Sequence, residues 1–190
     1  MGRIAQWFRR RAVANRQKHL VRNKRIHSFD TAKTVGLVFK MDKDTLPPEV
    51  LSTMRFLIGK GITCSSIGYY SGNVLPDSVI ATSSISLFTK AELSWYGRPI
   101  SDDVDRFLQQ HYDIVIDFCR EAEVYPVQYI VSSVQAAMVI GGVQYRDCPY
   151  DLIIDAQKVG TLEDYVEQIK HYLSVFNNPQ NVEQQTNSQP

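Results

Sequence analysis

Acidic residues are absent from the first 29 positions of this chain, and this gap divides its charge into two parts. The basic residues of that stretch are Arg3, Arg9, Arg10, Arg11, Arg16, Lys18, Arg22, Lys24 and Arg25. The other 12 Lys and Arg residues stand against all 20 Asp and Glu, so residues 1–29 carry +9 and residues 30–190 about −8. The net charge of +1 conceals this asymmetry, which predicts that the N-terminal segment binds an anionic surface.

Long apolar runs are missing as well. No stretch reaches the ~18–20 consecutive apolar residues that a membrane-spanning helix needs. The basic N-terminus is not followed by the apolar core, ~7–15 residues long, of a secretory signal. We therefore expect a cytoplasmic protein, either soluble or attached peripherally to the inner membrane.

Cysteine is scarce, and glycine-rich phosphate-binding motifs are absent. Cys64, Cys119 and Cys148 lie far apart, with no CxxC pair and no histidine pair nearby, so we expect buried free thiols and no metal site. The first expected connection from a strand to a helix, residues 39–48, has neither the dinucleotide-binding nor the P-loop glycine pattern. We expect no cofactor.

The basic segment, residues 1–30, is predicted to form a helical arm. Ala, Arg, Gln and Lys dominate residues 2 to about 27, and no Pro interrupts them. Ile4, Trp7 and Phe8 fall near one face of this helix, at spacings of three and four residues. The arm should therefore have an apolar tip and a shaft covered with charge.

Residues 31–177 alternate between β-branched runs and helical patterns. We predict strands at 33–40, 62–70, 85–89, 113–117, 137–140 and 151–155, and helices at about 47–58, 101–110, 126–135 and 161–176. Ser101, followed by two acids, is expected to cap the second of these helices. Strands separated by helices imply right-handed connections and a mostly parallel sheet, hence a single Rossmann-like, three-layer α/β domain. Residues 178–190 are polar and are expected to be disordered.

Two acids stand at the ends of predicted strands. Ligands of open α/β sheets bind at the carboxyl ends of strands, so Asp117 and Asp155 could act on a sugar, a metal or a proton. Capping of the following helix is the alternative interpretation. The two acids close similar runs, Tyr-Asp-Ile-Val-Ile-Asp at 112–117 and Tyr-Asp-Leu-Ile-Ile-Asp at 150–155, which we interpret as convergent strand sequences rather than a duplication.

Residues 93–99 combine a Trp, a Tyr and an Arg in a predicted loop. Exposed aromatic side chains beside Arg are typical of binding surfaces, which makes Trp95, Tyr96 and Arg98 a second possible ligand site. The alternative is that Trp95 anchors the loop to the core. The four histidines show no hydrolase-like arrangement, and we expect them to be solvated.

The nature of the anionic partner follows from the residue types of the arm. Seven of its nine basic residues are Arg, which favours phosphate contacts and therefore RNA or a ribonucleoprotein. The apolar tip suits the headgroup region of an anionic membrane, and it could equally enter a groove of an acidic protein.

Two resemblances can be stated. The basic segment, residues 32–36 (Ala-Lys-Thr-Val-Gly), 90–99, 112–117 and 167–173 together resemble an uncharacterised family of small Bacteroidetes proteins, a domain of unknown function, which implies no activity. Residues 112–117, the helix after them and residues 137–142 resemble the acceptor-side, N-terminal half of heptosyltransferase-like glycosyltransferases. This second likeness implies a similar half-fold without a donor site.

These observations favour a non-catalytic cytoplasmic accessory or adaptor protein whose arm docks on RNA or a ribonucleoprotein. One alternative is a peripheral membrane protein anchored by the N-terminal helix. The other is a degenerate glycosyltransferase-like enzyme that uses Asp117 or Asp155.

Overall fold

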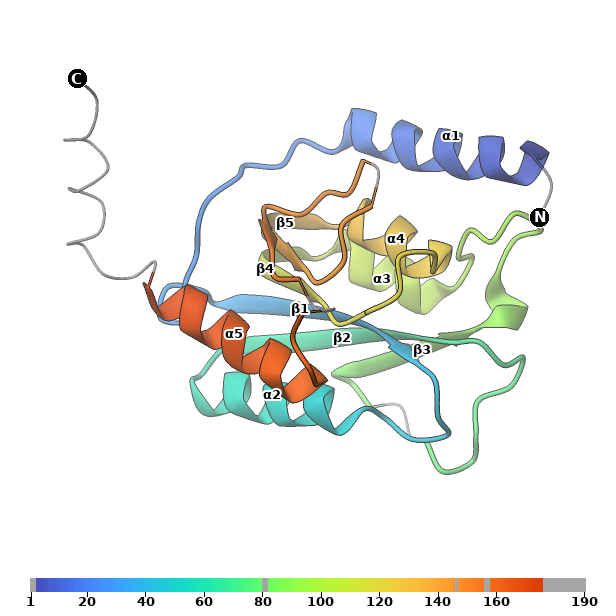
Figure 1. The fold of residues 1–190 in the computed structure, drawn as a ribbon. Coiled ribbons are helices and arrows are strands. Elements are labelled where there is room, and N and C mark those ends of the chain that lie inside the picture. The colour runs from blue at the N-terminus through green and yellow to red at the C-terminus, as the bar shows by residue number, and fades with distance from the viewer. Residues whose placement is uncertain (1–2, 80–81, 146, 156–157, 176–190) are drawn as a thin grey trace, which may run out of the picture.

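A sheet of six parallel strands forms the centre of the molecule, in the order β3-β2-β1-β4-β5-β6 (Figure 1). The strands are β1 (Thr34–Met41), β2 (Thr63–Tyr70), β3 (Ile85–Thr89), β4 (His111–Asp117), β5 (Gln135–Gly141) and β6 (Leu152–Ile153). All neighbouring pairs are parallel, which confirms the expected Rossmann-like α/β architecture. The computed structural model describes residues 3–79, 82–145, 147–155 and 158–175, so the predicted disordered tail lies outside the described residues.

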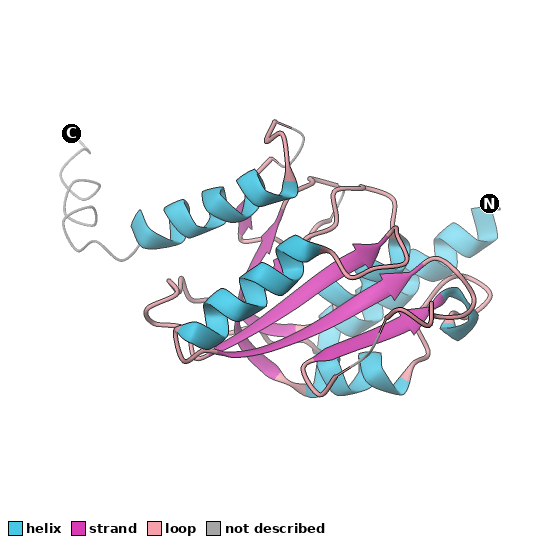
Figure 2. Cartoon of the chain, turned by 90° about the horizontal axis from the view of Figure 1, so that it is seen from below, coloured by secondary structure: helices cyan, strands magenta, loops and turns pink. Residues whose placement is uncertain are grey.

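Helices cover both faces of the sheet, and the three layers are visible in Figures 1 and 2. The α-helices of the described residues are α1 (Arg3–His19), α2 (Pro48–Gly59), α3 (Asp102–Gln109), α4 (Tyr125–Val131) and α5 (Leu162–Val175). The helices α2 and α5 pack together on one face, while α3 and α4 cover the other, with α1 outside them.

The central strands are apolar along their whole length because helices bury both of their faces. Successive side chains of β1 point to opposite layers: Leu37 and Phe39 enter the core under α2 and α5, and Val38 enters the core under α3 and α4. In β4, Ile114 and Val115 divide in the same way. A continuous β-branched run is thus the sequence expected of this position.

Several element ends differ from the sequence-based expectation. The helix α4 ends at Val131 instead of 135, because Ser132 and Ser133 turn the chain by donating their N–H groups to the carbonyls of Gln128 and Ile130. Ser101 precedes α3 without a side-chain capping hydrogen bond. The last strand, β6, has only two residues, and Asp155 therefore lies beyond it.

The strand order places the carboxyl ends of β1 and β4 next to each other at the point where the order reverses. Val38 of β1 pairs with Asp117, the last residue of β4. In open α/β sheets this reversal point is where ligands usually bind. Asp117 is consequently the sequence-predicted residue that lies closest to the usual ligand position of this fold.

The packing of side chains from the neighbouring strands over Gly68 of β2 can be tested by substitution. A Cβ atom there would lie 2.4 Å from the Phe39 ring and 2.6 Å from Leu87, both buried. We expect Gly68→Ala to lower the free energy of unfolding by about 1–3 kcal/mol in urea denaturation, because the core cannot expand freely. The control is Gly59→Ala, whose new methyl group meets no atom within 4 Å and should stabilise α2 by about 0.5 kcal/mol. Equal effects at the two glycines would contradict this packing.

Candidate functional site

The basic helix α1 is not a free arm, because one of its sides rests on the body above α4 (Figure 1). Ala12 and Val13 pack against the core that α3 and α4 cover, and Ala5 and Arg9 are half buried on the same side. These four positions follow the three- and four-residue spacing of one helical face. The opposite face of α1 is therefore presented to solvent in a fixed orientation.

Arg9 anchors this docked helix. Its Nε donates a hydrogen bond of 2.6 Å to the carbonyl of Tyr96, and its guanidinium lies 4.7 Å from the centre of the Tyr125 ring. The Tyr125 hydroxyl donates in return to the Arg9 carbonyl at 3.3 Å. Gly97 has a φ of 92°, and a Cβ there would come within 3.0 Å of the Arg9 side chain. Arg9, one of the predicted anion-binding residues, is thus used to hold α1 in place.

An exposed aromatic patch forms where α1 meets the 93–99 loop, and we define it as Ile4, Trp7, Phe8, Trp95 and Tyr96. The Phe8 ring centre lies 5.0 Å from that of Trp95, 5.8 Å from Tyr96 and 4.9 Å from Trp7. Trp7 is 54% exposed and Trp95 69% exposed, so Trp95 does not anchor its loop to the core. The structure thus brings together two groups of candidate residues that are far apart in the sequence, the apolar tip of the arm and the aromatic side chains of the 93–99 loop.

Five basic residues of α1 stay exposed beside this patch, and we call them the α1 cations: Arg3, Arg10, Arg11, Arg16 and Lys18. None of them forms an ion pair with any residue that the structure describes. The Arg11 guanidinium lies 5.2 Å from the Trp7 ring centre, which links the cations to the aromatic patch. Arg98 is exposed on the neighbouring loop.

The helix ends at His19, not near residue 27 as its composition predicts, because residues 20–29 run along the amino ends of the strands instead. The N–H group of Arg25 donates to the carbonyl of Ala137 in β5 at 3.2 Å. Arg22 donates to the carbonyls of Ala136 at 2.8 Å and Pro149 at 3.0 Å. Backbone and side-chain groups of this segment therefore pair with the sheet edge, and a helix would forfeit those bonds.

Asp151 forms ion pairs with two basic side chains of this segment, those of Arg22 and Lys24. It forms an ion pair with Arg22, and its Oδ1 lies 3.0 Å from the Lys24 Nζ. Its Oδ2 also accepts the N–H of Val139 at 2.8 Å. Burial alone would raise the pKa of Asp151, but the hydrogen bonds from Arg22, Val139 and Lys24 outweigh it and hold the pKa below its ordinary value.

Asp113, two strands away, also connects the sheet to the segment that follows α1. Its Oδ2 accepts the N–H groups of Lys33 at 2.6 Å and Thr34 at 3.0 Å, and its Oδ1 lies 3.8 Å from the His27 Nε2. Partial burial opposes these contacts, yet they lower the pKa of Asp113. His27 is only 9% exposed, so the expectation that it is solvated is wrong. Asp113 and Asp151 are the second residues of the two similar runs seen in the sequence.

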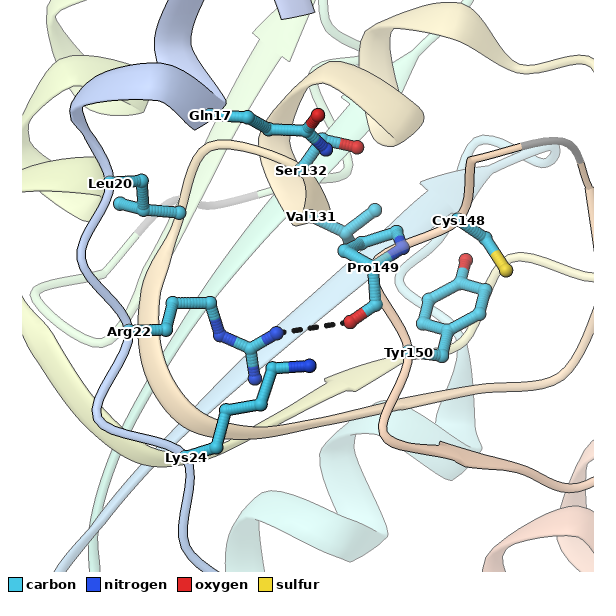
Figure 3. Close-up of a pocket in the computed structure, with 9 residues that line it drawn as sticks. All are labelled: Gln17, Leu20, Arg22, Lys24, Val131, Ser132, Cys148, Pro149 and Tyr150. Atoms are coloured by element: carbon cyan, nitrogen blue, oxygen red, sulfur yellow. Dashed lines mark hydrogen bonds between the residues drawn. The ribbon is translucent and has the colours of Figure 1, made fainter. Parts of the chain in front are cut away.

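A cavity of about 370 Å³ opens between the end of α1, the segment after it and the loop before β6 (Figure 3). Gln17 and Leu20 line it from the arm, together with Lys24. Tyr150 and Cys148 line it from the loop. The cavity thus lies between the basic segment and the α/β domain, at the end of α1 that carries Arg16 and Lys18.

At the carboxyl end of β4, Asp117 is enclosed and only 2% exposed. Its Oδ2 accepts the Tyr150 hydroxyl at 2.7 Å, and its Oδ1 accepts the N–H of Cys119 at 2.8 Å. Burial raises the pKa of Asp117 to about 6, although both hydrogen bonds act against this rise. The Tyr165 hydroxyl donates to the Asp117 carbonyl at 3.1 Å. Asp117 thus joins three segments through its carboxyl and carbonyl groups, and the described residues around it leave its side chain almost without solvent contact.

Asp155 takes no part in these hydrogen bonds of Asp117. Its side chain is 47% exposed, and its Oδ2 lies 3.3 Å from the Lys158 Nζ. Near the end of β1, Lys40 forms ion pairs with Asp42 at 2.6 Å and with Glu121 at 2.5 Å. Asp117 and Asp155, which were predicted to form one possible ligand site, therefore lie in separate sets of local contacts.

Tyr150 is the residue that sequence reasoning missed. Its ring covers Gly141, where a Cβ would lie 2.3 Å from a ring carbon. The glycine is thus required by the close approach of an aromatic ring to the end of β5. The pair of glycines at 141 and 142 was the only local signal, and it does not reveal which side chain covers them.

Cys64 and Cys119 are buried free thiols, as expected, and Cys148 is half buried. Within the described ranges, no group of three or more His, Cys, Asp or Glu side chains is placed to hold a metal ion. Among the helices that the structure describes, none is both long and apolar enough to cross a bilayer.

The fold and these contacts define an α/β protein with a closed strand-end region and a basic helix docked on its outside. A family model described as a family of unknown function (DUF6913) matches residues 4–176, and the chain belongs to this family. This confirms the resemblance to a domain of unknown function, and it shows neither the Bacteroidetes assignment nor the likeness to glycosyltransferases. No curated protein and no solved structure matches the chain in the same comparisons.

The enclosed carboxyl group gives a pH test. Since the pKa of Asp117 rises from 3.8 to about 6 on folding, the folded state binds this proton more tightly than the unfolded state. Stability of the wild type relative to Asp117→Asn should therefore fall by about 3 kcal/mol as the pH rises through that window. Urea denaturation of both proteins between pH 3 and pH 8 measures the difference, which cancels the other titrating groups. A difference independent of pH would contradict the enclosure of Asp117.

Proposed function

We propose that the protein is a non-catalytic accessory or adaptor protein of the cytoplasm that binds RNA or a ribonucleoprotein through α1. The observation that carries the proposal is the docked helix with the five α1 cations on its exposed surface and no acid in its sequence. A docked helix loses little conformational freedom on binding, which favours affinity. Cations that have no acidic partner among the residues that the structure describes are available for phosphates.

The chemistry of this surface supports single-stranded RNA. Four of the five α1 cations are Arg, whose planar guanidinium contacts phosphate oxygens in pairs and stacks on bases. Trp7 and Trp95 are exposed beside them and can stack on unpaired bases, which a duplex does not present. Aromatic side chains next to a cationic track are the usual combination in proteins that bind single strands.

A membrane surface is the second candidate, and the aromatic patch is the observation that favours it. Ile4 is 69% exposed on the helix surface next to Trp7 and Phe8, and such residues suit the boundary between headgroups and acyl chains. The α1 cations would then face anionic headgroups. The enzymatic alternative has less support, since Asp117 is enclosed and Asp155 is paired with Lys158.

The RNA proposal predicts a defined salt dependence. Single strands give a slope of log K against log salt of about −0.7 for each phosphate contact, so Arg10→Gln with Arg11→Gln should make the slope less steep by about 1.4. Fluorescence anisotropy of a labelled single-stranded RNA, titrated at several salt concentrations, measures it. The matched control is Arg55→Gln, which removes an exposed charge from α2 on the other side of the sheet. Equal losses from the two changes would overturn α1 as the binding surface.

The two candidates are separated by tryptophan fluorescence, because the only two tryptophans of the chain, Trp7 and Trp95, lie in the aromatic patch. Stacking on RNA bases should quench the emission. Insertion into anionic vesicles should shift it to shorter wavelength, since the rings leave water. We expect quenching by RNA and no shift with vesicles. A shift that requires anionic lipid, without an RNA effect, would replace RNA with the membrane.

A further inference from the structure

The cavity beside the end of α1 lies next to the exposed face of α1, along which the RNA strand is proposed to bind. Gln17, which lines it, stands between Arg16 and Lys18, two of the α1 cations. Lys24, on the segment after the helix, forms part of its rim and is 67% exposed. A phosphate chain bound along α1 would therefore reach the mouth of this cavity.

The walls of the cavity suit a flat ring. Leu20, Val131, Pro149 and the Tyr150 ring supply apolar surface to the lining of the cavity (Figure 3). Stacking of a base on an aromatic ring and on apolar side chains is favourable and tolerates different bases. The volume of about 370 Å³ is near the lower end of the ~300–1,000 Å³ of small-molecule sites, which fits one small ligand.

Polar groups supply about half of the cavity lining, from Gln17, Arg22, Lys24 and Ser132. The Gln17 amide both donates and accepts hydrogen bonds, and the Ser132 hydroxyl lies at the same end of the cavity in Figure 3. Arg22 is already engaged by the carbonyls of Ala136 and Pro149 and by Asp151. Lys24 shares Asp151 with Arg22, its Nζ lying 3.0 Å from Oδ1, but its side chain is 67% exposed, so it is the cation of the rim that a phosphate can reach.

We propose that this cavity binds a single nucleotide, with the base between Tyr150 and Leu20, its edge at Gln17 and Ser132, and its phosphate at Lys24. The inference rests on the proposed RNA function for the source of the nucleotide, which is one residue of the strand held on α1. A free nucleoside monophosphate offers the same chemistry. The test separates these two sources.

Cys148 provides a reporter inside the cavity. It lines the space and is half buried, whereas Cys64 and Cys119 are buried with their pKa raised to about 12, which suppresses their thiolates. The rate of alkylation of Cys148 by iodoacetamide, followed by peptide mass spectrometry, therefore reports on occupancy. A single-stranded RNA of about ten nucleotides should slow it about tenfold when present at about ten times its Kd.

Two controls test whether a base enters. An oligonucleotide of the same length without bases keeps the phosphates and should leave Cys148 reactive. Lys24→Gln should weaken the protection several-fold while the tryptophan quenching persists, and Lys43→Gln, which removes an exposed charge outside the cavity, should change neither. Equal protection by the oligonucleotide without bases would overturn the proposal.

The outcomes distinguish this inference from the proposed function. If RNA quenches Trp7 and Trp95 but does not protect Cys148, the cavity proposal fails and RNA binding by α1 stands. If a nucleoside monophosphate protects Cys148 and RNA affects neither reporter, the cavity proposal stands for a free nucleotide and the RNA function fails. If neither ligand protects Cys148 and RNA does not quench, both are wrong.

Discussion

The position of the basic arm depends on two carboxylates at the amino edge of the sheet. Asp113 and Asp151 each accept backbone N–H groups of a neighbouring strand or its approach, and each also faces a basic side chain of residues 20–29. Because both belong to the sheet region itself, they fix the segment to the most rigid part of the molecule. The side chains of Asp151 and Arg22 are only 18% and 10% exposed, so removing either would leave a poorly solvated charge. This attachment fixes residues 20–29 and with them one wall of the cavity, while Arg9 and the apolar contacts of Ala12 and Val13 hold α1.

The charge asymmetry of the sequence thus serves two purposes in one segment. Arg22 and Lys24 pair with an acid of the negatively charged body, and Arg9 holds α1 through a carbonyl and an aromatic ring. The α1 cations are not used in this way and remain exposed. The negative charge of residues 30–190 attracts the positively charged arm. Local contacts determine which of its basic side chains are paired within the protein. The net charge of a segment therefore overestimates the charge that it can offer to a partner.

The sheet could be predicted because its signal is local. A run such as that of β4 fits only a strand buried on both faces, and the connecting helices show their own period. The end of α1 could not, since helix propensity in residues 20–27 contains no information about Asp151, more than a hundred positions away. The same holds for Phe8 against Trp95 and for Tyr150 against Asp117, whose partners come from different elements. The α1 cations and the residues of the aromatic patch were all candidates from the sequence, whereas Tyr150 was not, and the contacts that bring these residues together are tertiary.

The contact between Arg22 and Asp151 spans 129 positions, and this separation has a consequence for the order of events during synthesis. At about 5–20 residues per second, roughly 6–26 s pass between the appearance of the first residue and the second. Throughout that interval Arg22 and Lys24 lack their acidic partner Asp151, and their positive charges are free to associate with nearby polyanions. The attachment of residues 20–29 is complete only when Asp151, which directly precedes β6, has been added. A nascent chain is therefore a stronger and less discriminating polycation than the finished protein.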